Sequence, residues 1–398
     1  MLELLAETNP RLIFSVALTI VVAAVLWWDR ENVERQFILF YRRTDRGLQK
    51  IDQIASKFPR FWKAYGSLGV LTGLISILIA LGMVLFTFYF MIDTGSTEGG
   101  PAMILPGLES ETEWQAGATF VPVEYWVISI AVLMFVHEMS HAIIARAEGF
   151  EINSVGWLVL GILPGAFVEP KGENMLPGSE QEESGSHTIW EGGDWKSRLK
   201  VLCAGSFANY VTAALFLGLA LGMTFAAAET TEDAVIGVQL FQGDEGIEYI
   251  ATEEGPAYQA GMRNGTLYSI DGFEIESIED IEASTVDLEI GQQIVLDTSE
   301  GEFTVEVSEG EVREIRESLE PYQAPLQWFT SMLLTVATLN FLIGLFNMVP
   351  IKPLDGGLSV ETLITEFWGE ENVKYLNKFS LVMWALLLGT IVVVLLGF

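Results

Sequence analysis

Two histidines and a glutamate stand close together in an otherwise apolar stretch, AVLMFVHEMSHAIIARAEGF, residues 131–150. His137 and His141 are four residues apart, so a helix places both imidazoles on one face, and Glu138 lies one step round from the first. This HExxH spacing suits zinc hydrolysis, in which two imidazoles hold Zn²⁺ and the neighbouring carboxylate takes a proton from water. Ionisable groups in a membrane-spanning segment need a function or a partner, since lipid does not solvate them. The alternative is a buried polar cluster that satisfies neighbouring helices.

A catalytic zinc site also needs a third protein ligand and an open position for water. The stretch NFLIGLFNMVPIKPLDGG, residues 340–357, ends a later apolar segment. Asp355 follows a proline-rich break and precedes two glycines that allow a tight backbone turn, so we expect its carboxylate to point back toward the helical pair.

Six apolar stretches approach the roughly 20 residues that a membrane-spanning helix needs. Residues 29–65 hold nine Lys and Arg and residues 93–122 hold none, which places the first loop in the cytoplasm and the second outside. Alternation brings the third and fifth stretches down in the same direction, so HEMSH and Asp355 reach one depth near the cytoplasmic side. The sequence therefore predicts a polytopic α-helical protein of the plasma membrane with about six transmembrane helices. The stretches lie near 11–28, 66–92, 123–147, 199–227, 326–349 and 376–398.

The long external segment between the fourth and fifth stretches shows short β-like runs around EEGPAYQAGMRNGTLYSIDG, residues 253–272. This stretch resembles the ligand-groove and helix region of a PDZ domain, in which a Gly-Pro-Ala turn opens a short helix and a final Asp-Gly pair closes a strand turn. A PDZ domain binds an extended peptide at a sheet edge. The interpretation is an inserted extracytoplasmic PDZ-like β/α domain, and the alternative is an unrelated small β domain.

HEMSH together with NMVPIKPLDGG looks like the site-2 protease family of intramembrane zinc metalloproteases, whose pattern is HExxH followed by NxxPxxxxDG. CAGSFANY resembles the Gly-x-x-x-Asn element of that family, although Ser206 stands where many members have proline. The resemblance covers roughly residues 123–368, and an inserted PDZ domain is a known arrangement in the family. It implies Zn²⁺ as the cofactor and a set of site residues: His137, His141 and Asp355 as ligands, Glu138 as general base, and Asn209 and Asn347 as hydrogen-bond donors to the substrate or to a developing oxyanion. Either asparagine could equally be a helix-packing amide.

This reading divides the chain into four parts. They are residues 1–122, a two-span region with a basic cytoplasmic loop; 123–228, the first part of the catalytic core; 229–322, the PDZ-like domain; and 323–398, the second part of the core with the final span.

A transmembrane helix shields its peptide bonds, so a substrate must be unwound locally and then needs a strand edge as partner. Residues 152–170 suit that role and predict a membrane-associated β-hairpin or loop, with a re-entrant packing segment as the alternative. The following polar stretch predicts a cytoplasmic loop in which His187 is solvated. Residues 358–368 predict an interfacial helix, and the basic loop at 29–65 is expected to attach to the inner leaflet.

The predicted function is an intramembrane zinc metalloendopeptidase that cleaves transmembrane segments of membrane proteins. Expected partners are a transmembrane substrate, a peptide tail at the PDZ-like domain and the bilayer. The formal net charge of −32 disfavours nucleic acid and suggests a halophilic source or an ordinary acidic protein. An alternative is a non-catalytic membrane scaffold with structural zinc, but such a site is closed by four protein ligands, and Cys203 and His187 are poorly placed to help. A transporter ranks last because internal repeats are absent.

Overall fold

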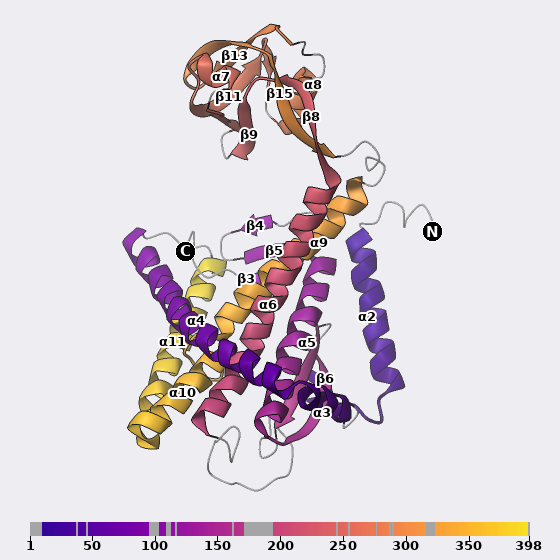
Figure 1. Cartoon of the computed structure of the whole chain (residues 1–398), viewed down its shortest axis with the longest axis vertical. Helices are drawn as coiled ribbons and strands as arrows, with labels where there is room; N and C mark the ends of the chain where they lie inside the picture. Colours follow the sequence, from indigo (N-terminus) through magenta and orange to yellow (C-terminus); the bar gives the residue numbers. More distant parts are fainter. Residues whose placement is uncertain are drawn as a thin grey trace. The chain divides into compact units, whose positions relative to one another are not determined.

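The computed structural model divides into two compact units (Figure 1), residues 1–221 with 328–398, and residues 222–327. It describes residues 10–36, 39–44, 47–94, 103–108, 113–115, 118–160, 163–170, 194–243, 246–253, 255–275, 277–285, 288, 290–315 and 323–396. The loop predicted after residue 170, with His187, lies outside these ranges.

Long helices dominate the first unit. Within the described residues, four are long and apolar enough to cross a membrane: α4 (Pro59–Thr94), α5 (Val123–Glu148), α6 (Trp195–Ala227) and α9 (Gln323–Asn347). They coincide with the second to fifth predicted stretches. The first and last predicted stretches fall on α2 (Pro10–Trp28) and α11 (Val373–Leu396), which are not among the four. The chain is thus a multi-pass membrane protein, and the count of six spans stays a prediction.

Helix α5 ends in a cap that turns the chain back on itself. Gly149 adopts a φ of 91°, and its N–H donates to the carbonyl of Arg146 while the N–H of Phe150 donates to that of Ala145. This pair of backbone hydrogen bonds, together with a left-handed glycine, is a Schellman motif. The buried ring of Phe150 then packs near the helix end, and the next strand returns alongside α5.

That strand belongs to a four-stranded antiparallel sheet of order β1-β2-β6-β7. Its members are β1 (Glu34–Gln36), β2 (Leu39–Thr44), β6 (Ile152–Leu160) and β7 (Leu163–Pro170). Strands β6 and β7 form a hairpin in the range where the sequence predicts one, and its association with the membrane stays a prediction. Strands β1 and β2 were not expected, because they come from the basic segment that was read as a loop.

Smaller elements complete the first unit. Helix α3 (Leu48–Lys57) packs against α5 through Ile51, and α10 (Asp355–Trp368) covers the range where an interfacial helix was predicted. A three-stranded sheet consists of β3 (Met103–Gly107), β4 (Glu113–Gln115) and β5 (Ala118–Pro122), and the short helix η2 spans Glu370–Asn372.

The second unit is a β-rich domain with its own apolar core, which includes Ile247, Tyr249 and Leu267. Asp271 and Gly272 both have positive φ and form the tight turn that the Asp-Gly pair predicts. The likeness to PDZ domains stays a prediction. Its elements are β8 (Ala228–Val235) paired with β15 (Ser308–Ile315), a sheet of β9 (Val238–Gly243), β10 (Gly246–Ala251), β11 (Asn264–Ile270), β12 (Phe273–Glu274), β13 (Gln293–Thr298) and β14 (Gly301–Glu306), and the helices α7 (Pro256–Gln259) and α8 (Ile278–Thr285).

Candidate active site

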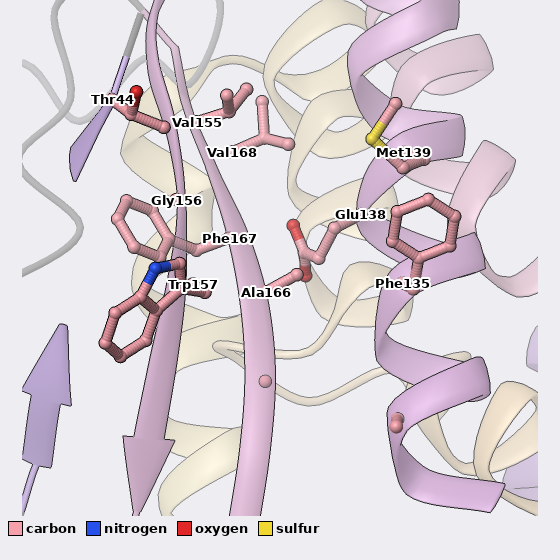
Figure 2. A pocket seen from close by; sticks show the side chains of 12 residues that line it. Thr44, Phe135, Glu138, Met139, Val155, Gly156, Trp157, Ala166, Phe167 and Val168 are labelled. Atoms are coloured by element: carbon pink, nitrogen blue, oxygen red, sulfur yellow. The ribbon is translucent and has the colours of Figure 1, made fainter. Parts of the chain in front are cut away.

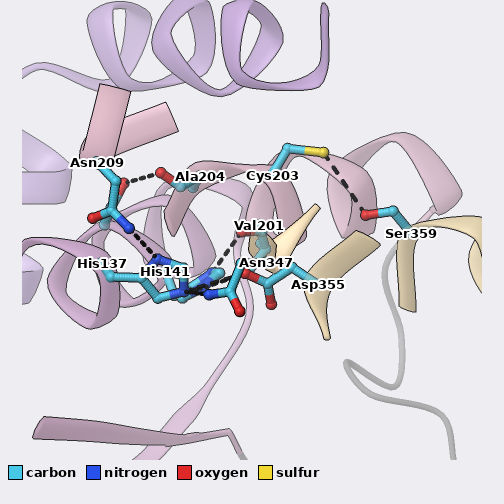
Figure 3. A network of polar contacts seen from close by, with 10 residues as sticks. His137, His141, Val201, Cys203, Ala204, Asn209, Asn347, Asp355 and Ser359 are labelled. Carbon is cyan, nitrogen blue, oxygen red and sulfur yellow. Dashed lines mark hydrogen bonds and ion pairs between the residues drawn. The ribbon is translucent and has the colours of Figure 1, made fainter. Parts of the chain in front are cut away.

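The structure brings His137, His141 and Asp355 into one cluster (Figure 3), in which both histidines are buried and Asp355 is partly buried. The Nε2 atoms of the two histidines are 3.0 Å apart. Oδ2 of Asp355 lies 3.2 Å from Nε2 of His137 and 3.5 Å from Nε2 of His141. Taking one potential ligand atom from each of the three residues, all three atoms lie within 4.8 Å of one another.

The hydrogen bond at the far side of His141 decides which ring nitrogen faces the cluster. Nδ1 of His141 lies 2.8 Å from the carbonyl oxygen of Val201. Because a carbonyl only accepts, Nδ1 carries the proton, and in the neutral ring Nε2 presents a lone pair to Asp355. A carboxylate oxygen and an imidazole lone pair repel each other unless a cation or proton lies between them. The cluster therefore fits a metal such as zinc, which takes these donors and whose histidine ligands donate from their second nitrogen.

Asn209 from α6 occupies the corresponding position behind His137. Its Nδ2 lies 3.1 Å from Nδ1 of His137, while its buried Oδ1 has no hydrogen-bond partner. Exchanging the two amide atoms lets Oδ1 accept a hydrogen bond from the Nδ1–H group of His137, which satisfies the buried oxygen and leaves Nε2 free for a metal. Asn347 lies on the other side, with Nδ2 at 3.3 Å from Nε2 of His137.

Helix α6 can approach the histidines this closely because Gly205 has no side chain. A Cβ built there would collide with Nε2 of His141 and with the ring of His137. The residue before Gly205 is hydrogen-bonded to α5, because Oγ of Ser140 donates to the backbone carbonyl of Ala204 at 2.9 Å. Gly205 was expected only as part of the Gly-x-x-x-Asn element, and the structure gives it a steric role at the site.

Asp355 is presented by the first turn of α10, and the two following glycines act differently from the expectation. Neither Gly356 nor Gly357 has a positive φ, so the prediction of a tight turn at these residues is wrong. A Cβ at Gly356 would instead collide with the carbonyl group of Met348, and one at Gly357 with that of Ile351. The glycines let the start of α10 pack directly on the preceding backbone.

Helix α11 anchors the loop that precedes Asp355. The N–H of Lys352 donates to Oγ of Ser380 at 3.0 Å, and Nε1 of Trp384 donates to the carbonyl of Lys352 at 2.8 Å. The Nζ of Lys352 forms an ion pair with Glu361 of α10 at 2.8 Å. Sequence reasoning missed Ser380 and Trp384, since nothing in their local sequence distinguishes them from other residues of an apolar helix.

Glu138 lies beside the ligands and faces a cavity of about 360 Å³ between α5 and the β6–β7 hairpin (Figure 2). Its carboxylate is hydrogen-bonded by the backbone of Val168 in β7 and interacts electrostatically with both histidines and Asp355. Most of the cavity wall is apolar, with Phe135 and Trp157 on opposite sides (Figure 2). A carboxylate at the junction of an apolar cavity and a metal-ligand group can move a proton to or from a molecule bound there.

The remaining candidate residue, Cys203, is buried on α6 with its Sγ 3.8 Å from Oγ of Ser359. It does not join the potential metal ligands found among the described residues. A lone cysteine in an apolar run is most simply a small core or interface residue, and the burial of Cys203 agrees with this interpretation.

Comparison with known proteins decides the family. A sequence model of peptidase family M50 matches residues 125–390, about two thirds of the chain. The chain belongs to peptidase family M50, the site-2 protease family. Members of this family are zinc metallopeptidases. Family membership and the apolar helices together identify the M50 protein as a membrane metallopeptidase. It is also 24% identical over 373 residues to a protein of Methanocaldococcus jannaschii named "Uncharacterized protein MJ0971", covering 90% of this chain and 88% of the relative.

Proposed function

We propose that this M50 protein is a zinc endopeptidase that cuts transmembrane segments of other membrane proteins near the cytoplasmic side. The observation that carries the proposal is the meeting of three ligand atoms within 4.8 Å beside Glu138, which faces an apolar cavity. Family membership supports the metallopeptidase chemistry, and the position of the site within long apolar helices supports a membrane-embedded substrate.

His137, His141 and Asp355 are the metal ligands in this proposal. Bound by them, zinc supplies a Lewis acid that polarises the scissile carbonyl and lowers the pKa of a water molecule toward about 7. Val201 and Asn209 hold the two imidazoles in the tautomer that leaves Nε2 free.

Glu138 is the general base and acid. Its carboxylate oxygen accepts a proton from the attacking water and then transfers it to the nitrogen of the leaving amine. Asn347 supports the reaction from the opposite side, because its Nδ2 lies beside His137 and can donate to the oxygen that gains charge as the carbonyl is attacked.

The substrate is bound as an extended strand along β7. A helical substrate keeps its carbonyls hydrogen-bonded internally, so it must unwind before the backbone can lie across the site. Strand β7 is one of the two edge strands of its sheet among the described residues, and a sheet edge offers main-chain partners to the unwound segment.

The membrane arrangement is part of the same proposal. The chain crosses the plasma membrane about six times, with α2 and α11 as the additional spans and the basic residues of 29–65 in the cytoplasm. The second unit is a PDZ-like extracytoplasmic domain that binds a peptide tail and admits substrates whose external part is already trimmed. Deleting residues 232–318 should release cleavage of untrimmed reporters, and unchanged selectivity after deletion would contradict the gating role.

The experiment that tests the reaction uses the full-length protein in detergent with a single-span reporter. We compare wild type, a chelator-treated sample, Glu138→Ala, and Glu366→Ala as a control at an exposed acid of α10, and we quantify zinc in each. We expect Glu138→Ala to bind zinc without cutting and Glu366→Ala to behave as wild type. Cleavage by Glu138→Ala at the wild-type rate would exclude Glu138 as the base.

The second candidate function is a membrane scaffold with a structural zinc ion. It is disfavoured because the described residues bring three potential ligands together, whereas a structural site is closed by four. Zinc bound without cleavage of any transmembrane reporter, also after removal of residues 232–318, would favour the scaffold.

A further inference from the structure

We propose that β2, which precedes the region matched to the family, forms part of the substrate cleft and sets a preference for a bulky apolar side chain beside the cut bond. This inference rests on the proposed endopeptidase function and names residues outside 125–390. Tyr41 is a positioning residue in this proposal, and Thr44 is a wall residue of the cleft.

Strand β2 first decides which edge of the sheet a substrate can use. It pairs with β6 without interruption, from Leu39 opposite Leu160 to Thr44 opposite Val155. The outer edge of β6 is therefore occupied, and β7 keeps the edge position on the side of α5. An unwound substrate is directed to the strand whose backbone reaches Glu138.

Close approach of β2 depends on Gly156 in β6. A Cβ there would collide with the carbonyl oxygen of Arg42 in β2 and with the ring of Phe167 in β7. The missing side chain thus lets the phenylalanine ring lie across β6. Arg42 also ties the strand to the end of α2 through a 2.8 Å ion pair with Asp29, in which the side chains are 26% and 14% exposed.

Tyr41 determines where that phenylalanine lies. Tyr41 and Phe167 are 4% and 5% exposed and form one apolar cluster, with Leu39 and Leu158 packed against it. The hydroxyl group of Tyr41 donates to Oε2 of Glu34 at 3.0 Å, while the ring itself is held by the apolar cluster. Because Phe167 lines the cavity, the position of Tyr41 is transmitted to the cavity wall.

The cavity itself has the composition of a side-chain pocket. Its wall combines large apolar side chains with small residues that leave space. The large ones are Phe135, Met139, Trp157 and Phe167, and the small ones are Ala131, Gly156, Gly165 and Ala166. Thr44 contributes directly to the wall, so β2 touches the cavity as well as supporting it (Figure 2). A volume of about 360 Å³ next to Glu138 fits a bulky apolar side chain with part of its backbone, and apolar walls select such a group by burial.

The test compares cleavage of two reporters that differ in one residue beside the cut, leucine or alanine, by full-length wild type and Tyr41→Ala. We expect wild type to prefer leucine, and we expect Tyr41→Ala to reduce that preference about tenfold, the scale set by a misfitting apolar pocket. Zinc content should not change, because the proposed ligands lie on α5 and α10. Tyr41→Phe, which keeps the ring, should restore the preference, and Phe58→Ala, at a 56% exposed ring, should leave it intact.

Wild type without a leucine preference, or a zinc-loaded Tyr41→Ala with the wild-type preference, would overturn the inference. If Tyr41→Ala does not fold, a photo-crosslinking amino acid at Thr44 in the Glu138→Ala background replaces it. Crosslinking to the reporter at Thr44 and not at Lys50, an exposed position of α3, supports the cleft role, and equal labelling at both overturns it. Failure of wild type to cut any reporter would count against the proposed function, whereas the crosslink does not require cleavage.

Discussion

Replacement of Gly205 by alanine tests the packing of α6 on the histidine pair. The added Cβ would collide with Nε2 of His141 and with the ring of His137, and His141 cannot turn away without losing its hydrogen bond to Val201. Inserting one extra carbon into a tightly packed contact costs about 1–3 kcal/mol. If relief of this strain displaces the ligands, metal affinity falls about 5- to 150-fold, since each 1.4 kcal/mol is a factor of about ten.

Alanine also raises helix propensity, by about 0.5–1 kcal/mol relative to glycine. That gain acts on the folded protein with and without metal, so it cancels from the affinity and appears only in thermal stability. Gly218 is the matched control on the same helix, because a Cβ there meets nothing within 4 Å. Gly218→Ala should keep wild-type zinc affinity.

The assay is zinc competition between the detergent-purified protein and a chromophoric chelator of known affinity, with melting followed by circular dichroism. We expect Gly205→Ala to lose the competition at chelator concentrations where wild type and Gly218→Ala retain zinc. A folded Gly205→Ala with wild-type affinity would refute the steric argument.

Three further substitutions test the supports around the site. Trp384→Phe removes the hydrogen bond to the carbonyl of Lys352, worth about 1 kcal/mol, and should weaken zinc binding about fivefold in the same competition. Lys200→Met removes the cation that lies 2.9 Å from Glu148, whose side chain is 6% exposed. Thermal melts should show a loss of about 3 kcal/mol in the free energy of unfolding. This is the low end for a broken buried pair, because Lys200 is 20% exposed. Asp194→Asn should make the free energy of unfolding depend less on pH in the acidic range. The backbone hydrogen bond from Ser197 lowers the pKa of Asp194, so its stabilisation is present above the ordinary pKa and is lost as pH falls through the lowered value.

Two of these substitutions have a matched control. Trp368→Phe, at a ring that is 67% exposed, should leave zinc binding unchanged. Lys196→Met, at an exposed lysine on the same helix, should change stability by less than about 0.5 kcal/mol. In the acidic range, a wild-type pH profile in Asp194→Asn would show that the N-terminal hydrogen bond of α6 does not contribute.

Local patterns predicted the parts of the structure that depend on local physics. The lengths of the apolar stretches predicted the long helices. A run of about 20 apolar residues in lipid must satisfy its backbone N–H and C=O groups internally, and a helix does so. The resemblance of residues 253–272 to a PDZ domain predicted a strand turn at Asp271 and Gly272, and both residues have the positive φ that such a turn needs. The role of Gly356 was predicted wrongly, because a glycine required for turning and one required for close packing look alike in a sequence.

The sheet beside α5 shows what local patterns could not reveal. Strand β2 pairs with β6 across more than one hundred residues of chain, and such a register depends on where the intervening helices bring the two segments. The basic residues between 34 and 44 concealed the strand, since Arg42 and Arg43 are charged yet are held by acids at 2.8 Å.

The sequence by itself determined the chemistry that is available. The four-residue spacing puts His137 and His141 on one helix face, and ionisable residues rarely occupy an apolar span without a function. Only the tertiary structure decided how that chemistry is positioned. It brought Asp355 to the pair from more than two hundred residues away, set Gly205 against both rings, and placed the β6–β7 hairpin in front of Glu138. The reason is physical, because helix periodicity is fixed by neighbours along the chain, whereas side-chain convergence and close backbone approach depend on how separate elements pack.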